Sequence, residues 1–252
     1  MTSGVLYSRR RRAGAPPRLL VVDSDLGSLA TFVVLLRRRF HVDTALTGRQ
    51  AISRLALFKP RLLILDAQLP DLEGVYILQA LRARYPACPA VVVTELGDHL
   101  AVRRLTGERI DGVFEKISFW AAVDQLTVPL IANAYHPGLS QDIAKAIDYV
   151  RQRYATRCTV DDISAYLAMS PSSLAHKFRA QTTATVRGYV IDVRVEVAKL
   201  LLRHTDDKLE AIAQRAGFCD SPHLCRTFRC RHLGRPDESR ATLRDYRVHG
   251  EP

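Results

Sequence analysis

Short apolar runs alternate with helical patterns in the first half of the chain. Each run ends in a polar residue, so that Asp23, Asp66 and Thr94 follow the runs 19–22, 61–65 and 89–93. Between the runs, apolar residues recur at helical spacing, as at Leu29, Phe32, Val33 and Leu36 and at Ala51, Leu55 and Leu57. This alternation predicts a parallel sheet covered by helices on both faces. Because functional groups collect at the carboxyl ends of such strands, we expect Asp23, Asp66 and Thr94 to share one crevice.

The second half of the chain has no strand pattern and is rich in helix-capping residues. Thr159 and Asp162 have the spacing of a capping box, and apolar residues follow them at helical spacing. Ser170-Pro171 then begins a new helix, in which Leu174 and Phe178 mark the inner face. Two short helices joined so closely predict a helix-turn-helix unit whose second helix is the recognition helix.

The same pattern occurs a second time further along the chain. Leu209, Ile212 and Ala213 predict one helix, Gly217-Phe218 a turn, and Ser221-Pro222 the start of the next helix, with Leu224 and Phe228 inside. The helix between the two units, from Val186 to Arg203, would be about 27 Å long at ~1.5 Å per residue. The DNA major groove repeats every ~34 Å, so this spacer suits two recognition helices on one face of a duplex.

These patterns divide the chain into four parts. We expect a flexible basic arm over residues 1–17, an α/β domain over 18–133, a linker over 134–140 and a helical domain over 141–252. The arginines at positions 9–12 are typical of an export signal, but the apolar run after them is too short for one. No stretch approaches the ~18 apolar residues of a membrane helix, so we expect no membrane partner.

Composition narrows the class of partner. The formal net charge is +11 and the sequence pI about 9.8, which favours a polyanion such as nucleic acid. Five cysteines without a CxxC pair indicate reduced thiols in a cytoplasm. One stretch carries several metal-ligand types but fits no usual zinc spacing, so we interpret its thiols as packing or redox-sensing groups; it contains Cys219, His223, Cys225, Cys230 and His232.

Residues 143–240 resemble the double helix-turn-helix domain of the bacterial AraC/XylS family of transcription regulators. The matching positions include Ile147-Asp148-Tyr149-Val150, Ser170-Pro171, Tyr189, Arg194, Ala198-Lys199-Leu200-Leu201, Ile212-Ala213, Gly217-Phe218 and Pro236. The resemblance implies a regulator that binds double-stranded DNA in the cytoplasm, at the nucleoid, with RNA polymerase as a further contact. Departures at Ala168, Thr183, Leu233 and Ser239 affect turns and packing.

Residues on the outward faces of the two recognition helices are the candidate DNA contacts. Arg226 suits bidentate pairing with guanine, whereas Lys177, Arg179, Arg229 and Arg231 suit phosphate. The remaining candidates are Ser172, His176, Ser221 and His223. Because Ala175 and the serines of the first unit reach only a short distance, we expect specificity to come mostly from the second unit or from DNA shape.

Residues 18–133 resemble the receiver domain of two-component response regulators, a flavodoxin-like doubly wound fold with a five-stranded parallel sheet. The run from Leu65 to Gly74 carries the resemblance, with Asp66 as the candidate phosphoacceptor. Asp23 and Asp25 correspond to the acids of the family's pocket, Thr94 to its switch hydroxyl and Lys116 to the lysine of its last strand. The resemblance implies Mg²⁺ held by Asp23 and Asp66, a sensor histidine kinase as partner and a homodimer.

Four positions in the receiver pocket depart from that family pattern. Ser24 replaces the second acid, Glu95 replaces a small residue, Val113 the switch aromatic and Ile117 the proline after the lysine. The charge of Glu95 would repel a dianionic phosphate. We therefore hypothesise that phosphorylation of Asp66 is weakened or lost, and that the domain serves in dimerisation or docking.

The sequence offers two alternative functions. The run Asp23-Ser24-Asp25 also resembles the first motif of haloacid-dehalogenase-type phosphatases, but the acidic motif that such enzymes need downstream has no place before the helical domain. A protein-interaction module whose helix-turn-helix units no longer bind DNA is the other alternative, and the outward arginines argue against it. We therefore predict a DNA-binding regulator and not an enzyme.

Overall fold

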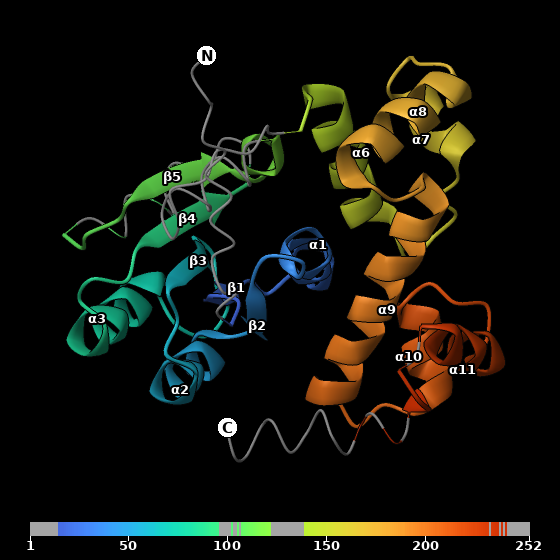
Figure 1. The fold of residues 1–252 in the computed structure, drawn as a ribbon. Helices are drawn as coiled ribbons and strands as arrows, with labels where there is room; N and C mark the ends of the chain where they lie inside the picture. The colour runs from blue at the N-terminus through green and yellow to red at the C-terminus, as the bar shows by residue number, and fades with distance from the viewer. Residues whose placement is uncertain are drawn as a thin grey trace, which may run out of the picture.

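The computed structural model describes residues 15–95, 102, 105, 107–121, 139–231, 233–236, 238 and 240. Figure 1 shows an α/β domain beside a helical domain, as the sequence predicted. Residues 1–14 of the predicted basic arm and 134–138 of the predicted linker lie outside the described residues, and so do His232 and Ser239. The domain boundaries therefore stay predictions. In the described part of the chain, no helix is both long and apolar enough to cross a bilayer.

The first domain contains a five-stranded sheet in which all neighbouring strands are parallel. The strands are β1 (Arg18–Val22), β2 (His41–Ala45), β3 (Leu62–Asp66), β4 (Ala90–Thr94) and β5 (Gly112–Glu115). Their order, β2-β1-β3-β4-β5, is that of a flavodoxin-like doubly wound fold. Val22 pairs with Leu65, and Asp66 with Val93, so the carboxyl ends of the central strands lie at one edge. The predicted fold class is confirmed.

Helices cover both faces of this sheet because its central strands are apolar on both sides. On one face, α2 (Gly48–Phe58) and α3 (Gly74–Arg84) pack on a core that includes Leu20, Val22 and Leu65. On the other face, α1 (Leu26–Leu36) packs on Leu19 and Val21. The sequence placed Leu57 on the inner side of its helix with Leu55, and this was wrong: Leu55 is buried, whereas Leu57 is exposed because it lies only two residues further along the helix.

The first helix-turn-helix unit follows α6 (Gln141–Arg153) and consists of α7 (Val160–Tyr166) and α8 (Pro171–Thr182). The predicted capping box is confirmed, since Thr159 and Asp162 each accept a hydrogen bond from the other's backbone N–H. Ala168 and Thr183, which stand where the family usually has glycine, adopt left-handed φ values of 50° and 59°. The turns therefore keep their geometry at the cost of some backbone strain.

The second unit consists of α10 (Leu209–Arg215) and α11 (Ser221–Cys230), and α9 (Val186–His204) joins it to the first unit. Gly217 forms the turn with φ +84°, and a Cβ there would lie 2.5 Å from the carbonyl oxygen of Tyr154. α11 begins at Ser221, as the sequence predicted. Its cap differs from the serine cap of α8: Asp220, one residue earlier, accepts from the backbone N–H of His223 at 2.6 Å.

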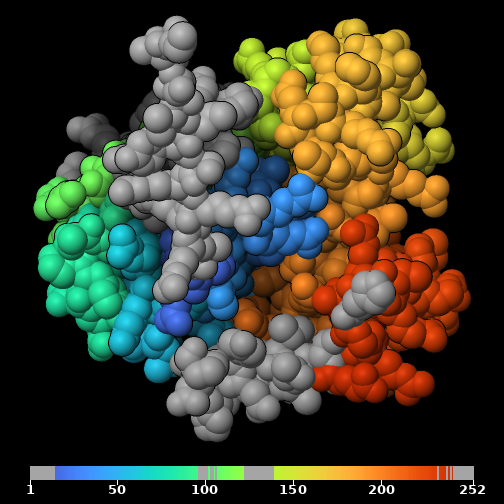
Figure 2. Space-filling view, in the orientation of Figure 1, coloured from blue at the N-terminus to red at the C-terminus, as the bar shows by residue number. Residues whose placement is uncertain are grey.

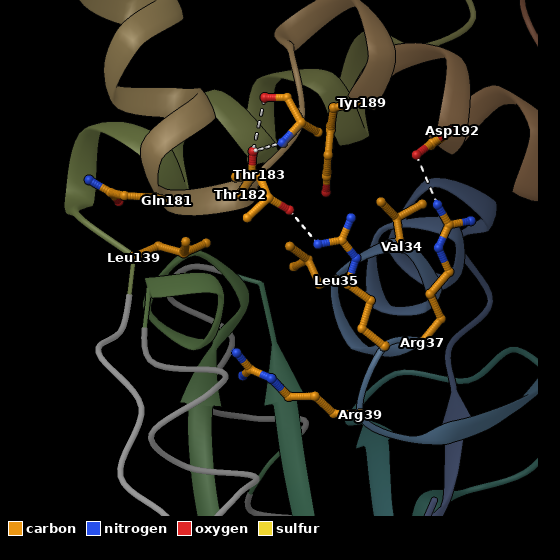
Figure 3. A pocket seen from close by; sticks show the side chains of 12 residues that line it. Val34, Leu35, Arg37, Arg39, Leu139, Gln181, Thr182, Thr183, Tyr189 and Asp192 are labelled. Carbon is orange, nitrogen blue, oxygen red and sulfur yellow. Dashed lines mark hydrogen bonds and ion pairs between the residues drawn. The ribbon is translucent and has the colours of Figure 1, made fainter.

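The two domains are docked through α1, which lies between the sheet and α9 (Figure 1). Arg37 at the end of α1 pairs with Asp192 at 2.9 Å and with Glu196 at 3.2 Å, both on α9. Arg203 of α9 pairs with Asp43 of β2 at 3.2 Å. A cleft between α1 and the start of α9 is lined by both domains, and Figure 3 shows Arg37 reaching across it to Asp192.

Candidate functional site

The outward face of α8 is exposed along its length while the receiver is docked. Leu174 and Phe178 are fully buried beneath the helix, which turns the intervening positions outward. Of the predicted DNA contacts on this helix, Ser172, His176, Lys177 and Arg179 are all exposed. Lys177 pairs with Asp142 at 3.3 Å, but both side chains are about half exposed, so a phosphate can compete for this lysine.

The outward face of α11 is more mixed than the sequence suggested. Arg226 and Arg229 are exposed, and Ser221 and His223 are half-buried. The His223 ring meets the Phe218 ring edge-on at a centroid distance of 5.3 Å, so it also has a packing role. Arg231 lies just beyond the helix and pairs with Asp192 of α9 at 2.5 Å. Among the predicted contacts of this unit, Arg226 and Arg229 therefore have the most open geometry.

The spacing of the two units follows from the length of α9. Its 19 residues correspond to about 28 Å at ~1.5 Å per residue. The helix is buried among both units through Tyr189, Val193, Val197 and Leu201, so it acts as a rigid spacer. In Figure 2 the segments of α8 and α11 both reach the surface on the side away from the receiver. The docked receiver therefore leaves both outward faces free.

The receiver pocket lies at the carboxyl ends of the strands. The ammonium of Lys116, directly after β5, is 2.9 Å from Asp23 and 2.7 Å from Asp66. Thr94, the last residue of β4, is buried at the same edge of the sheet. Glu95 follows it and reaches Lys116 at 3.2 Å with an exposed side chain. The residues that the sequence singled out at strand ends therefore gather around one buried lysine.

Burial controls the charges in this pocket. Burial, and then the neighbouring charge of Asp66, raises the pKa of Asp23 to about 7. Burial alone would lower the pKa of Lys116, but the carboxylates of Asp23 and Asp66 outweigh it and raise that pKa. The lysine is therefore a permanent cation that holds the two acids together.

Asp25, which the sequence placed in the pocket, has a different partner in the structure. Its carboxylate accepts from the backbone N–H of Ser28 at 2.7 Å and caps α1. The same oxygen lies 3.4 Å from the guanidinium of Arg151, which belongs to α6 of the helical domain. Sequence reasoning missed Arg151, because its spacing to Asp148 indicates only a pair within one helix and not a partner in another domain.

The pocket does not fit Mg²⁺ in this arrangement. Oδ1 of Asp23 accepts from the backbone N–H of Asp25, and Oδ1 of Asp66 from that of Gln68, each at 2.8 Å. The second oxygen of each acid faces Lys116, and Ser24 supplies no further carboxylate. Mg²⁺ needs free carboxylate oxygens and room for its waters. Within the described residues, no group of three or more His, Cys, Asp or Glu is placed to hold a metal.

The cysteines of the second unit lie at or near its surface. Cys219 and Cys230 are exposed, and Cys225 is half-buried on α11. No two described cysteines form a disulfide, and His232 lies outside the described residues. The interpretation of these residues as packing or redox-sensing thiols stays a prediction.

Two family models match the chain. Residues 19–121 match the response regulator receiver domain, and residues 163–242 match a helix-turn-helix domain. The two regions coincide with the α/β domain and with both helix-turn-helix units of the structure. Each match falls within the part of the chain for which the sequence predicted that kind of domain.

Three relatives illustrate the similarity. The HTH-type transcriptional regulator YijO of Escherichia coli is 35% identical over 102 residues, 40% of this chain and 36% of the relative. The arabinose operon regulatory protein of Escherichia coli is 29% identical over 112 residues, 44% and 38% of the two chains. The transcriptional regulatory protein PrrA of Mycobacterium leprae is 31% identical over 141 residues, 56% and 52% of the two chains.

The chain spans about a third to a half of the length of these relatives, and each is named as a regulator of transcription or of an operon. The family matches leave no segment for the phosphatase considered from the sequence, because helix-turn-helix units occupy the region where its last acidic motif would fall. The chain thus contains a response regulator receiver domain followed by a helix-turn-helix domain of the AraC type.

Proposed function

We propose that the chain is a sequence-specific DNA-binding transcription regulator that reads two successive major grooves with α8 and α11. The observation that carries the proposal is that both outward faces are exposed, and held apart by α9, while the receiver is docked. The net charge of +11 supports binding to a polyanion. In this proposal the receiver packs against the side of the helical domain opposite the DNA and leaves the outward faces of α8 and α11 uncovered.

Within this proposal, α11 supplies most of the sequence specificity. Arg226 has the exposure and reach for a bidentate contact to a guanine edge. The exposure of Arg179 and Arg229 suits phosphate contacts, and we assign shorter contacts with the DNA to Ser172, Ser221 and His223. A homodimer, RNA polymerase contact and action at the nucleoid are further parts of the proposal, and they rest on the family resemblance.

The test of this proposal begins with selection of binding sites from a random DNA pool, followed by affinity measurements on the selected site. We expect Arg226→Ala to weaken binding by about 1–3 kcal/mol and to relax specificity at one base pair. Arg229→Ala should weaken binding to all sequences alike and reduce the slope of log K against log salt by about 1. Arg84→Ala on α3, an exposed arginine of the receiver, is the control and should change neither quantity.

A second part of the proposal is that the regulator binds DNA without phosphorylation of Asp66. Lys116 already neutralises Asp66, and Glu95 places a further negative charge beside the pocket. A sensor kinase would therefore have to transfer a dianion into a pocket whose oxygens are already engaged.

We expect Asp66→Asn to leave the affinity for the selected DNA site within about twofold of wild type, since a twofold change is only about 0.4 kcal/mol. Titration of both proteins on the same site measures this. The same titration is repeated after both proteins are treated with a phosphodonor. If treated wild type then bound the site much more tightly than the treated variant, phosphorylation would control binding.

A further inference from the structure

A chain of ion pairs runs from the receiver pocket into the helical domain. Asp66 contacts Lys116 at 2.7 Å, Lys116 contacts Glu95 at 3.2 Å, and Glu95 contacts Arg151 at 3.3 Å. Arg151 in turn pairs with Asp148 of its own helix at 2.8 Å. The charges alternate in sign along the whole chain. We call these five residues the ion-pair chain.

Arg151 is the member that crosses the domain boundary. It lies on α6, and its side chain is only 9% exposed, although it carries a permanent charge. Burial would lower its pKa, but Asp148, Glu95 and Asp25 outweigh the burial and raise it. The receiver thus supplies two of the three carboxylates that hold this buried guanidinium.

The backbones of the two domains also meet at this point. A Cβ on Gly27, in the first turn of α1, would lie 2.4 Å from the carbonyl oxygen of Arg151 and 3.0 Å from the Tyr154 ring. Only glycine allows α1 to approach α6 so closely. The docking of the domains therefore places Arg151 at the mouth of the Asp66 pocket.

We propose that Arg151 is the counter-cation of the receiver pocket, supplied by the DNA-binding domain in place of a metal ion. Glu95 joins this arginine to Lys116, which accounts for a carboxylate at a position where the family pattern has a small residue. A divalent cation or a phosphoryl group then enters the pocket only when the two domains separate. This inference goes beyond the proposed function and does not depend on DNA binding.

The physical basis is electrostatic. Lys116 pairs with Asp23 and Asp66 inside the pocket, and Arg151 pairs with Asp25 and Glu95 beside it, so an entering dication would meet carboxylates that two protein cations already neutralise. Glu95 is 57% exposed, so solvent weakens its ion pairs. The docked state therefore depends on the packing of α1 against α9, on the buried Arg151 and on the close fit at Gly27. The apparent affinity of a pocket ligand equals its affinity for the open state multiplied by the fraction of molecules that are open.

The test uses the full chain and Mg²⁺ with beryllofluoride as the phosphoryl analogue, titrated by calorimetry. Arg151→Gln removes the counter-cation, whereas Gly27→Ala leaves every charge in place and obstructs only the docking. Arg153→Ala is the matched control, because this exposed arginine on the same helix lies over the Tyr149 ring and not at the pocket. Small-angle scattering on the four proteins reports domain separation.

Both test variants are expected to bind the analogue at least about tenfold more tightly than wild type. This gain follows if about 10% or less of the wild-type molecules are open and the variants are mostly open. Arg153→Ala should match wild type, and Gly27→Ala should increase the radius of gyration. If Arg151→Gln fails to fold, Gly27→Ala still tests the inference, since it removes no charged group and acts only through the docking. Equal affinities in all proteins, or no binding by any of them, would overturn it.

Discussion

Replacing Phe178 or Phe228 by alanine is expected to lower the free energy of unfolding of the helical domain by about 3–5 kcal/mol. Both rings are fully buried, each beneath a recognition helix, and the Phe178 ring packs edge-on against Tyr189 of α9 at 5.4 Å. Removing either ring leaves a cavity under the helix that it anchors. Affinity for the selected DNA site should fall with stability, because α8 or α11 loses its fixed orientation.

Urea unfolding followed by circular dichroism measures the stability, and DNA titration measures the affinity. Tyr166→Ala is the control: this tyrosine of α7 is exposed and stacks only on Tyr149 at the surface, so we expect a loss below about 1 kcal/mol. If the Phe178 and Phe228 variants lost no more stability than the Tyr166 variant, the two recognition helices would not depend on the core described above.

Replacing Lys116 by methionine should lower the free energy of unfolding of the receiver by about 3 kcal/mol, the lower end of the range for breaking a buried ion pair. The substitution leaves Asp23 and Asp66 buried together without their shared cation. The loss stays near the lower end because the pKa of Asp23 is already about 7, and this acid takes up a proton when the lysine is gone.

Chemical denaturation of the full chain at pH 8 measures this effect. The double variant Lys116→Met with Asp66→Asn should regain part of the lost stability, since it removes one of the two unpaired acids. Lys145→Met on α6, an exposed lysine, is the matched control and should stay within about 0.5 kcal/mol of wild type. A single variant as stable as this control would mean that the pocket acids are not ionised.

Local patterns predicted most of the fold. The apolar runs identified three strands to within one residue at each end, because a strand buried on both faces must be apolar throughout. The capping box at Thr159 and the proline at the start of α8 predicted the first helix-turn-helix unit, because those side chains act on their own backbone neighbours. These features can be predicted because each depends only on residues that are close together in the sequence.

The contacts between domains left no such signal. Arg151 looks in the sequence like one half of an intrahelical pair with Asp148, and Gly27 looks like a weak helix residue. Their shared role appears only when α1 and α6 are side by side. Likewise, the chemistry of Asp25 depends on whether it caps α1 or turns to the pocket, and spacing alone is compatible with both. The sequence therefore located the pocket but not the residue that closes it.

The central claim, that both helix-turn-helix units bind one duplex face while the receiver is docked, is tested most directly by a hydroxyl-radical footprint of the full chain on a selected DNA site. The account predicts two protected segments about 10–10.5 base pairs apart on the same face of the duplex, one for α8 and one for α11. Protection of a single segment, or protection that does not depend on sequence, would contradict it.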